Sequence, residues 1–337
     1  MRTLAVLASP LRKAIASVVA LVIIFIVWFA VQVFPIGGSG REVLVTVHSG
    51  DSMSKIAGEL HQSGVLSSSF AFRVDALLQG SPLVQPGVYE IRQGDDFPSI
   101  VSILSGGPNV PQVDVTPGLT IREITDTVAA QVGTTFATTF LSDTKQAATT
   151  SSYNPSGSLE GLIGPGTYLI TPGETPAQLL AAMQSAFTKE ATAAGLAPTD
   201  SYEGLSAYQL VTGASIVEKE GYYPKNMPQV ARVILNRLAD NMPLQMDSTV
   251  LYALGLDGGT VTPHMLQTPS PYNSYLNHGL TPTPICVVSP QALAAMLHPP
   301  VGSWLYFVLV DKNGDMAFST TFAQQLANEA KAARAGV

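Results

Sequence analysis

The stretch VDVTPGLTIREI, residues 113–124, decides how this chain folds. Its β-branched start predicts a strand, the Gly118-Leu119-Thr120 triplet a tight turn, and the periodic apolar residues after it a helix. Thr120 is a good N-cap because its side-chain oxygen can accept a hydrogen bond from a free N–H of the first helical turn. Glu123, three residues later, completes a capping box. The stretch therefore predicts strand, turn and helix in immediate succession.

The same order of signals occurs three more times. The runs VLVTVH, VYEIR and TYLIT are followed by the triplets Gly50-Asp51-Ser52, Gly94-Asp95-Asp96 and Gly173-Glu174-Thr175. Thr175 forms a second capping box with Gln178. The first glycines of the four triplets are 44, 24 and 55 residues apart, which is too irregular for a solenoid. We therefore predict an α+β chain built from small modules.

A membrane-spanning helix is predicted near the N-terminus. Residues 14–34, AIASVVALVIIFIVWFAVQVF, are 21 residues without a charge, long enough for the ~30 Å apolar core of a bilayer. A cleaved signal peptide is the alternative, but its apolar region is usually only about 7–15 residues long, and no A-x-A site follows here. Arg2, Arg12 and Lys13 precede the span. By the positive-inside rule they predict a cytoplasmic N-terminus and a body outside the cell membrane.

Composition excludes several classes of protein. The chain has 337 residues, of which 46% are hydrophobic and 12% charged, so it is not a disordered polar chain. Three of its 17 basic residues lie in the first 13 positions, which leaves 14 basic against 24 acidic residues in the rest. A chain with this excess of acidic residues is not expected to bind the phosphates of nucleic acid. Cys286 is the only cysteine, which excludes an intrachain disulfide and a cysteine-built metal site.

The signals divide the chain into six regions. We expect a tail, a transmembrane helix, a linker, a first module, an intermediate α+β region and a catalytic region, over residues 1–13, 14–34, 35–42, 43–107, 108–204 and 205–337. The motif VTVxxGDSxxKIA, residues 45–57, resembles a LysM-type carbohydrate-binding unit. A generic capped strand-helix unit is an equal alternative. Residues 134–158, rich in Ser, Thr and Ala, are expected to form a loop.

The helix predicted over residues 205–221 ends in two carboxylates. Leu210, Ala214 and Val217 form its apolar stripe. At about 100° per residue, the side chains of Glu218 and Glu220 point some 200° apart, so one cleft cannot use both. Glu218 falls inside the apolar sector and Glu220 at its edge. Periodicity alone does not choose between them, and two merely solvated charges are the alternative.

The rest of this region holds further candidates. Asn226-Met227-Pro228-Gln229 predicts a capping box that opens a helix. Asp247 is either a second functional carboxylate or the N-cap of a short helix over residues 248–254. Residues 268–282 are dense in Pro, Tyr and Asn and predict an irregular loop, either a sugar-binding surface or a rigid connector. A strand over 304–310, a turn, a strand over 316–319 and a helix from 322 close the chain.

Several separated motifs resemble, in their order, the YceG-like endolytic murein transglycosylases. They are LEGxxxPxTY, ASIVEKE, ILNRL, MPLQxDxTVxY, SPYNSY and LYFV, at residues 159–168, 214–220, 234–238, 242–252, 270–275 and 305–308. Together with the predicted anchor and the LysM-like region, the resemblance covers nearly the whole chain.

The resemblance implies a single-pass membrane enzyme that cleaves the β-1,4 bond after N-acetylmuramic acid within glycan strands. One carboxylic acid protonates the departing oxygen, the sugar's own C6 hydroxyl attacks, and a 1,6-anhydro end forms without a cofactor or metal. The catalytic residue implied is Glu220. The substrate-binding residues implied are Asn236, Gln245, Asp247, Thr249, Tyr252, Tyr272 and Asn273. Peptidoglycan is the expected partner, with peptidoglycan synthases as further candidates.

Other functions remain open at this point. Ser248 stands where the family usually has proline, so the turn at Asp247 differs from the usual pattern. A hydrolytic muramidase, in which Asp247 activates water, is one alternative. A non-catalytic peptidoglycan-binding scaffold of the division or elongation machinery is the other. Ser52-x-x-Lys55 matches an acyl-transferase motif, but no K-T-G follows it. The five histidines lack metal-binding spacing.

Overall fold

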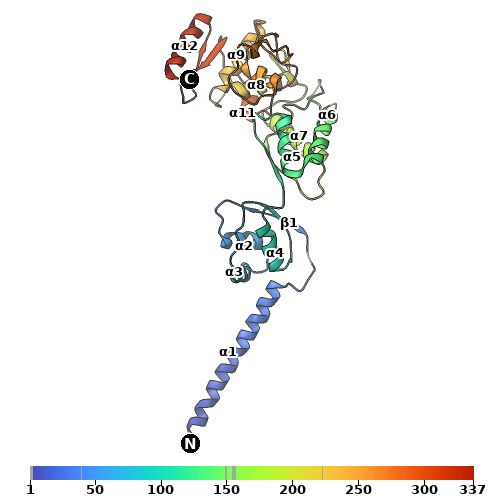
Figure 1. Cartoon of the computed structure of the whole chain (residues 1–337), viewed down its shortest axis with the longest axis vertical. Coiled ribbons are helices and arrows are strands. Elements are labelled where there is room, and N and C mark those ends of the chain that lie inside the picture. Colours follow the sequence, from blue (N-terminus) through green and yellow to red (C-terminus); the bar gives the residue numbers. More distant parts are fainter. Residues whose placement is uncertain (1–2, 39, 149, 154–156, 222) are drawn as a thin grey trace. The chain divides into compact units, whose positions relative to one another are not determined.

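The computed structural model describes residues 3–38, 40–148, 150–153, 157–221 and 223–337. In this part of the chain the strands form two-stranded sheets among many helices, so the predicted mixed α+β class is confirmed (Figure 1). The chain divides into two compact units, Met1–Pro111 and Gln112–Val337. Arg2, which contributes to the predicted orientation in the membrane, lies outside the described residues.

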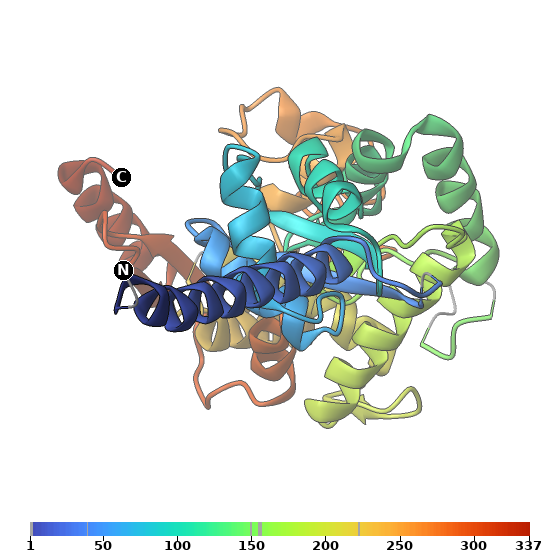
Figure 2. The ribbon, with the colours of Figure 1, turned by 90° about the horizontal axis from the view of Figure 1, so that it is seen from below.

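The first unit begins with α1, Thr3–Val33, which is one unbroken helix (Figures 1 and 2). Its segment Arg12–Val33, 22 residues long, is the one helix of the described chain that is long and apolar enough to cross a membrane. Most of its large apolar side chains are exposed, for example Leu21 and Ile24. Such a surface is unfavourable in water and favourable in lipid.

A small module completes the first unit. It runs β1 (Glu42–Val47), α2 (Met53–Gln62), α3 (Ser69–Leu78), β2 (Gly87–Arg92) and α4 (Phe97–Gly106). Strands β1 and β2 pair antiparallel, from Glu42 opposite Arg92 to Val47 opposite Gly87. The predicted caps are confirmed, because the side chains of Ser52 and Asp96 accept from Lys55 N–H and Ser99 N–H. The module has an apolar core of its own.

The second unit begins with a strand pair and three helices. These are β3 (Gln112–Val115), α5 (Ile121–Val132), α6 (Thr134–Ala148), β4 (Gly166–Leu169) and α7 (Pro176–Ala193), with β3 and β4 antiparallel. Both predicted capping boxes, Thr120 with Glu123 and Thr175 with Gln178, are present. Thr120 thereby fixes the start of α5 next to the site described below.

The loop predicted over residues 134–158 is wrong for residues 134–148, which form α6. The buried side chains of α6 are Ala137, Phe140, Thr144 and Ala148, which recur on one face of the helix. They pack toward α5 and α7. Because packing of an apolar face stabilises a helix more than intrinsic propensity does, the threonine-rich composition did not prevent its formation.

The remainder of the second unit surrounds α8, Ala207–Glu220. The other elements are β5 (Ser201–Tyr202), β6 (Leu205–Ser206), α9 (Met227–Ala239), α10 (Asp247–Leu254), a 3₁₀ turn η1 (Met265–Gln267), α11 (Pro290–Leu297), β7 (Tyr306–Leu309), β8 (Met316–Ser319) and α12 (Phe322–Ala335). Helix α8 contacts α9, α10 and α11, and its residues 207–217 are buried except for the exposed Gln209. This packing holds its C-terminal carboxylates in place.

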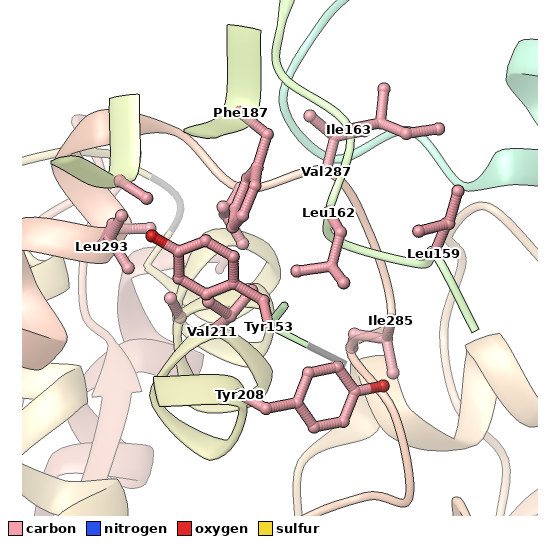
Figure 3. Packing of buried hydrophobic residues seen from close by; sticks show 14 of the residues in the cluster. Tyr153, Leu159, Leu162, Ile163, Phe187, Tyr208, Val211, Ile285, Val287 and Leu293 are labelled. Carbon is pink, nitrogen blue, oxygen red and sulfur yellow. The ribbon is translucent and has the colours of Figure 1, made fainter. Parts of the chain in front are cut away.

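One apolar core runs through the second unit. Figure 3 shows Leu162, Ile163 and Phe187 from its first part next to Val211 and Ile285 from its second part. The core thus joins residues that the sequence analysis assigned to an intermediate region and to a catalytic region. Between its members Ile285 and Val287 lies Cys286, whose thiol is fully buried and donates to the Ser215 carbonyl at 3.3 Å.

The capping box predicted at Asn226 is wrong. Asn226 does precede α9, but its side chain makes no cap hydrogen bond and its backbone is helical. Its Nδ2 donates instead to the carbonyl of Gly314 at 2.9 Å. Asn226 therefore ties the start of α9 to the turn between β7 and β8.

Candidate active site

The two carboxylates at the end of α8 have different partners. Glu218 Oε2 accepts from the backbone N–H of Ser289, the N-cap of α11, at 2.9 Å. Glu220 Oε1 accepts from the backbone N–H of Ser248 at 3.1 Å and from its hydroxyl at 2.6 Å. The predicted divergence of the two side chains is therefore confirmed. Glu218 secures a helix start, while Glu220 faces α10.

The surroundings of Glu220 favour its protonated form. Burial raises the pKa of this carboxyl, the two hydrogen bonds from Ser248 lower it, the charge of Asp247 raises it and that of Arg237 lowers it. Burial is the largest of these effects, so the pKa lies above its usual value. Among the described residues, Ser248 supplies the hydrogen bonds that Glu220 accepts, and both go to Oε1. Oε2 is left for a ligand.

Glu220 and Asp247 both line two cavities. The leucine cavity, about 340 Å³, is lined by Thr120, Lys219, Glu220, Asp247, Ser248, Leu251, Tyr252, Leu256, Asp257, Gly258 and Ile285. The glutamine cavity, about 410 Å³, is lined by Glu220, Arg237, Gln245, Met246, Asp247, Tyr275, Tyr306, Phe307, Val308, Phe322, Gln325 and Glu329. Because they share these two carboxylates, Glu220 lies where the cavities adjoin.

Two more cavities continue from the leucine cavity. The tyrosine cavity, about 410 Å³, shares Thr120, Tyr252 and Leu256 with it and is also lined by Arg122, Glu160, Ala253, Gly255, Ser270, Pro271 and Tyr272. The lysine cavity, about 420 Å³, shares Arg122 and Glu160 with the tyrosine cavity and extends to Lys145. Neighbouring cavities thus share lining residues in the order lysine, tyrosine, leucine and glutamine, and Glu220 lies between the leucine and glutamine cavities.

Asp247 is not the helix cap that one interpretation of the sequence favoured. Helix α10 begins at Asp247 itself, and Met246 holds the N-cap position without a side-chain bond. Asp247 Oδ1 accepts instead from the hydroxyl of Tyr275 at 2.6 Å. Gln245, two residues earlier, has φ +52°, a left-handed conformation that is uncommon outside glycine. Such conformations concentrate at functional sites.

Four of the expected substrate-binding residues line the cavities and three do not. Gln245, Asp247, Tyr252 and Tyr272 are the cavity residues. The polar groups of the other three bond to the protein itself. Asn236 donates to the Gly302 and Trp304 carbonyls, Asn273 to the Leu266 and Thr268 carbonyls, and Thr249 to the Met246 carbonyl. These three residues support the loops around the site.

Three residues at the site received no role from the sequence. Arg237 is buried, donates to the carbonyls of Leu305 and Leu244, and lines the glutamine cavity. Ser248 holds Glu220. Glu160 is buried and lines two cavities. Arg237 and Glu160 lie within the motifs that carry the family resemblance, which was the available signal.

Comparison with known proteins identifies the family. The YceG-like family model matches residues 45–331 of the chain. This chain belongs to the YceG-like family. It is similar to a protein of Bacillus subtilis (strain 168) named endolytic murein transglycosylase, with 30% identity over 315 residues, 87% of this chain and 85% of the relative. The resemblance inferred from the motifs is therefore confirmed.

Other relatives of this YceG-like chain agree. An endolytic murein transglycosylase of Streptococcus pneumoniae serotype 2 (strain D39 / NCTC 7466) is 28% identical, over 82% of this chain and 56% of the relative's length. A crystal structure of a yceG-like protein from Listeria monocytogenes has 26% sequence identity and a TM-score of 0.54, covering 86% of this chain and 99% of that one. Within the residues described for this YceG-like chain, no cluster of three His, Cys, Asp or Glu side chains could hold a metal ion.

Proposed function

We propose that this chain is an endolytic murein transglycosylase, which cleaves the bond after N-acetylmuramic acid inside glycan strands and leaves 1,6-anhydro ends. Family membership and the names of the relatives support the activity. The observation that carries the chemistry is Glu220, a carboxyl with a raised pKa that accepts hydrogen bonds from the described residues on Oε1 alone and lies where two cavities adjoin.

Glu220 is proposed to act first as acid and then as base. A carboxyl whose pKa is raised by burial retains its proton closer to neutral pH and can give it to the departing glycosidic oxygen. The C6 hydroxyl of the same muramic acid then forms a bond to the anomeric carbon and returns its proton to Glu220. Ser248 assists the second step, because its N–H and hydroxyl stabilise the carboxylate that the first step creates.

Asp247 is proposed to bind substrate and not to activate water. Its Oδ1 already accepts from Tyr275, so the hydroxyl of Tyr275 holds this carboxylate at the cavity wall. No second carboxylate is required when the nucleophile belongs to the substrate, since the C6 hydroxyl is held near the anomeric carbon and outcompetes free water. Gln245, Tyr252 and Tyr272 are proposed to contact the sugars through hydrogen bonds and ring stacking.

The series of cavities supports cleavage within a strand. The glutamine cavity lies on one side of Glu220, and the leucine, tyrosine and lysine cavities follow one another on the other. A strand that occupies cavities on both sides of the carboxyl is cut at an internal bond.

The N-terminal part is proposed to keep the enzyme at its substrate. We propose that α1 is a single-pass anchor with residues 1–13 in the cytoplasm and the chain after Phe34 outside. Arg12 and Lys13 at the start of its apolar segment, and the apolar surface after them, support this orientation. The β1–α2–α3–β2 module is proposed to bind carbohydrate as a LysM-like unit, which its motif at residues 45–57 supports. Binding to peptidoglycan synthases is a further prediction.

The test is a mass spectrum of the chain ends formed from purified glycan strands. The full chain should produce new muramic acid ends about 18 mass units, one water, lighter than hydrolytic ends, since ring closure replaces attack by water. Glu220→Gln should produce none, and Glu218→Gln serves as the matched control. Ordinary reducing ends would identify a muramidase instead, and the absence of new ends a non-catalytic binding protein.

A further inference from the structure

Glu160 is a buried carboxyl that the proposed mechanism does not use. It lies between α6 and β4 and is only 6% exposed. Its Oε1 accepts from the backbone N–H of Ile121, the first residue of α5, at 3.0 Å. Its Oε2 accepts from the hydroxyl of Tyr252 on α10 at 3.2 Å. One carboxyl thus joins the start of one helix to an aromatic side chain on another.

Tyr252 is the cavity-lining aromatic side chain that Glu160 holds. Its ring forms part of the wall of both the leucine and the tyrosine cavity. It also contacts the ring of Tyr272, with the centroids 4.9 Å apart. The hydroxyl of Tyr272 pairs with that of Thr283 at 2.8 Å. The position of Tyr252 therefore determines the shape of the passage from the Glu220 site into the tyrosine cavity.

We propose that Glu160 is a positioning residue, which holds Tyr252, and through it Tyr272, as a sugar-contacting wall next to the Glu220 site. This inference rests on the proposed function, because it assumes that a glycan strand occupies these cavities. Glu160 does not touch the substrate bond that breaks. It acts by fixing the ring and the hydroxyl direction of Tyr252.

The groups that face Glu160 give this role a dependence on pH. They are Arg122 and Glu123 on α5, Tyr252 on α10, and Cys286 in the segment before α11. Burial raises the pKa of Glu160 to about 7, while the hydrogen bonds from Ile121 and Tyr252 and the charge of Arg122 lower it and that of Glu123 raises it. Glu160 therefore changes its charge in the neutral range, unlike an ordinary glutamate.

The two protonation states hold Tyr252 differently. Ionised Glu160 only accepts, so the Tyr252 hydroxyl donates to it, and the Tyr252 oxygen, which the Thr283 side chain also contacts, can accept from donors on the sugar. Protonated Glu160 has an O–H of its own that competes to donate to Tyr252, and the tyrosine hydrogen is then free to turn. Because a hydrogen bond to a charged group contributes more than one between neutral groups, we expect glycan affinity to rise about fivefold as Glu160 loses its proton.

The test measures binding without cleavage. The full chain carrying Glu220→Gln is titrated with peptide-free glycan strands from pH 5.5 to 8.5, alone and combined with Glu160→Gln or Tyr252→Phe. The Kd of the parent should fall about fivefold with a midpoint near pH 7. Either added substitution should abolish this pH dependence, and both together should do no more than one, since each breaks the same bond.

A matched control variant tests whether the pH dependence is specific to Glu160. Glu190→Gln replaces another carboxyl with a raised pKa, on α7 and outside the four cavities, and should leave the midpoint unchanged. A pH dependence that survives both Glu160→Gln and Tyr252→Phe overturns the role of Glu160 but leaves the proposed function intact. Strands that do not bind at any pH contradict both.

Discussion

The surroundings of Glu220 and of Glu160 are built from the same parts. Each carboxyl accepts a backbone N–H from the first turn of a helix, Ser248 of α10 for one and Ile121 of α5 for the other. Each also accepts a hydroxyl, from Ser248 and from Tyr252. Burial raises both pKa values.

The difference lies in how many of the two carboxylate oxygens accept hydrogen bonds from the protein. Both hydrogen bonds of Glu220 go to Oε1, and two cavities open beside it. Glu160 also lines two cavities, but it accepts one hydrogen bond on each oxygen and is only 6% exposed. A carboxyl can exchange a proton with a substrate only through an oxygen the substrate can reach. The same donors therefore give a reactive group at one place and a positioning group at the other.

The strongest test of this comparison exchanges each carboxyl for an amide. Glu220→Gln should reduce the cleavage rate by about 10²–10⁴-fold, the usual contribution of a general acid, with little change in thermal stability. Glu160→Gln should retain most of the rate at saturating substrate and act mainly on KM. Release of 1,6-anhydro ends, measured over time, gives both values. An inactive Glu160→Gln enzyme beside an active Glu220→Gln enzyme would reverse the two roles.

The next largest effect is the change that Glu160→Gln makes in the pH dependence of the free energy of unfolding. Its folded-state pKa of about 7 exceeds the ordinary value of 4.5, so the folded chain binds the proton more tightly and loses stability as pH rises between these values. The loss amounts to about 3 kcal/mol. Glutamine does not titrate. The stability of Glu160→Gln relative to wild type should therefore increase by about this amount from pH 4.5 to 7.5.

Urea unfolding of both chains, followed by near-ultraviolet circular dichroism at several pH values, measures this difference. The difference should be constant above pH 8, where Glu160 is ionised in both the folded and the unfolded chain. A difference that does not vary between pH 4.5 and 7.5 would contradict the raised pKa and, with it, the pH-dependent part of the positioning role.

A smaller effect is expected at the Ser248 hydroxyl, which donates to Glu220. Ser248→Ala removes the 2.6 Å hydrogen bond to Oε1 and keeps the backbone N–H. Because that hydroxyl stabilises the carboxylate and so lowers the pKa of Glu220, its loss should raise this pKa further. Activity that requires protonated Glu220 should then persist to higher pH. The pH–rate profile of kcat checks this, and an alkaline limb that moves down or stays fixed would be inconsistent with it.

The smallest effect is expected at Glu218, two residues from Glu220. Its Oε2 accepts the Ser289 N–H at the start of α11, and glutamine keeps an oxygen for that bond. Glu218→Gln should change stability by about 1 kcal/mol or less and leave the rate within a few-fold of wild type. A variant as inactive as Glu220→Gln would show that the catalytic role was assigned two residues too late.

Local signals in the sequence predicted local structure well. Ser52, Asp96, Thr120 and Thr175 all cap the helices expected of them, because a cap depends on atoms three residues away. Asp247 carries the same signal, yet it bonds to Tyr275, 28 residues later in the chain. The sequence around Asp247 does not predict that Tyr275 is its partner.

The parts that sequence did not predict depend on contacts between distant segments. Helix α6 is stabilised by packing against α5 and α7, which its threonine-rich composition conceals. The partners of Glu160 are 39 and 92 residues away, so neither its burial nor its raised pKa follows from its neighbours in the chain. The family motifs contained Glu160 and Arg237 but assigned no role to either.

The single cysteine provides a built-in reporter of unfolding. Burial raises the pKa of the Cys286 thiol, and only the thiolate attacks alkylating reagents. The folded chain should therefore resist labelling, and modification should proceed only when the core around Cys286 opens. At low reagent concentration the labelling rate then measures the free energy of that opening under native conditions. No engineered probe is required, because the rest of the chain has no competing thiol.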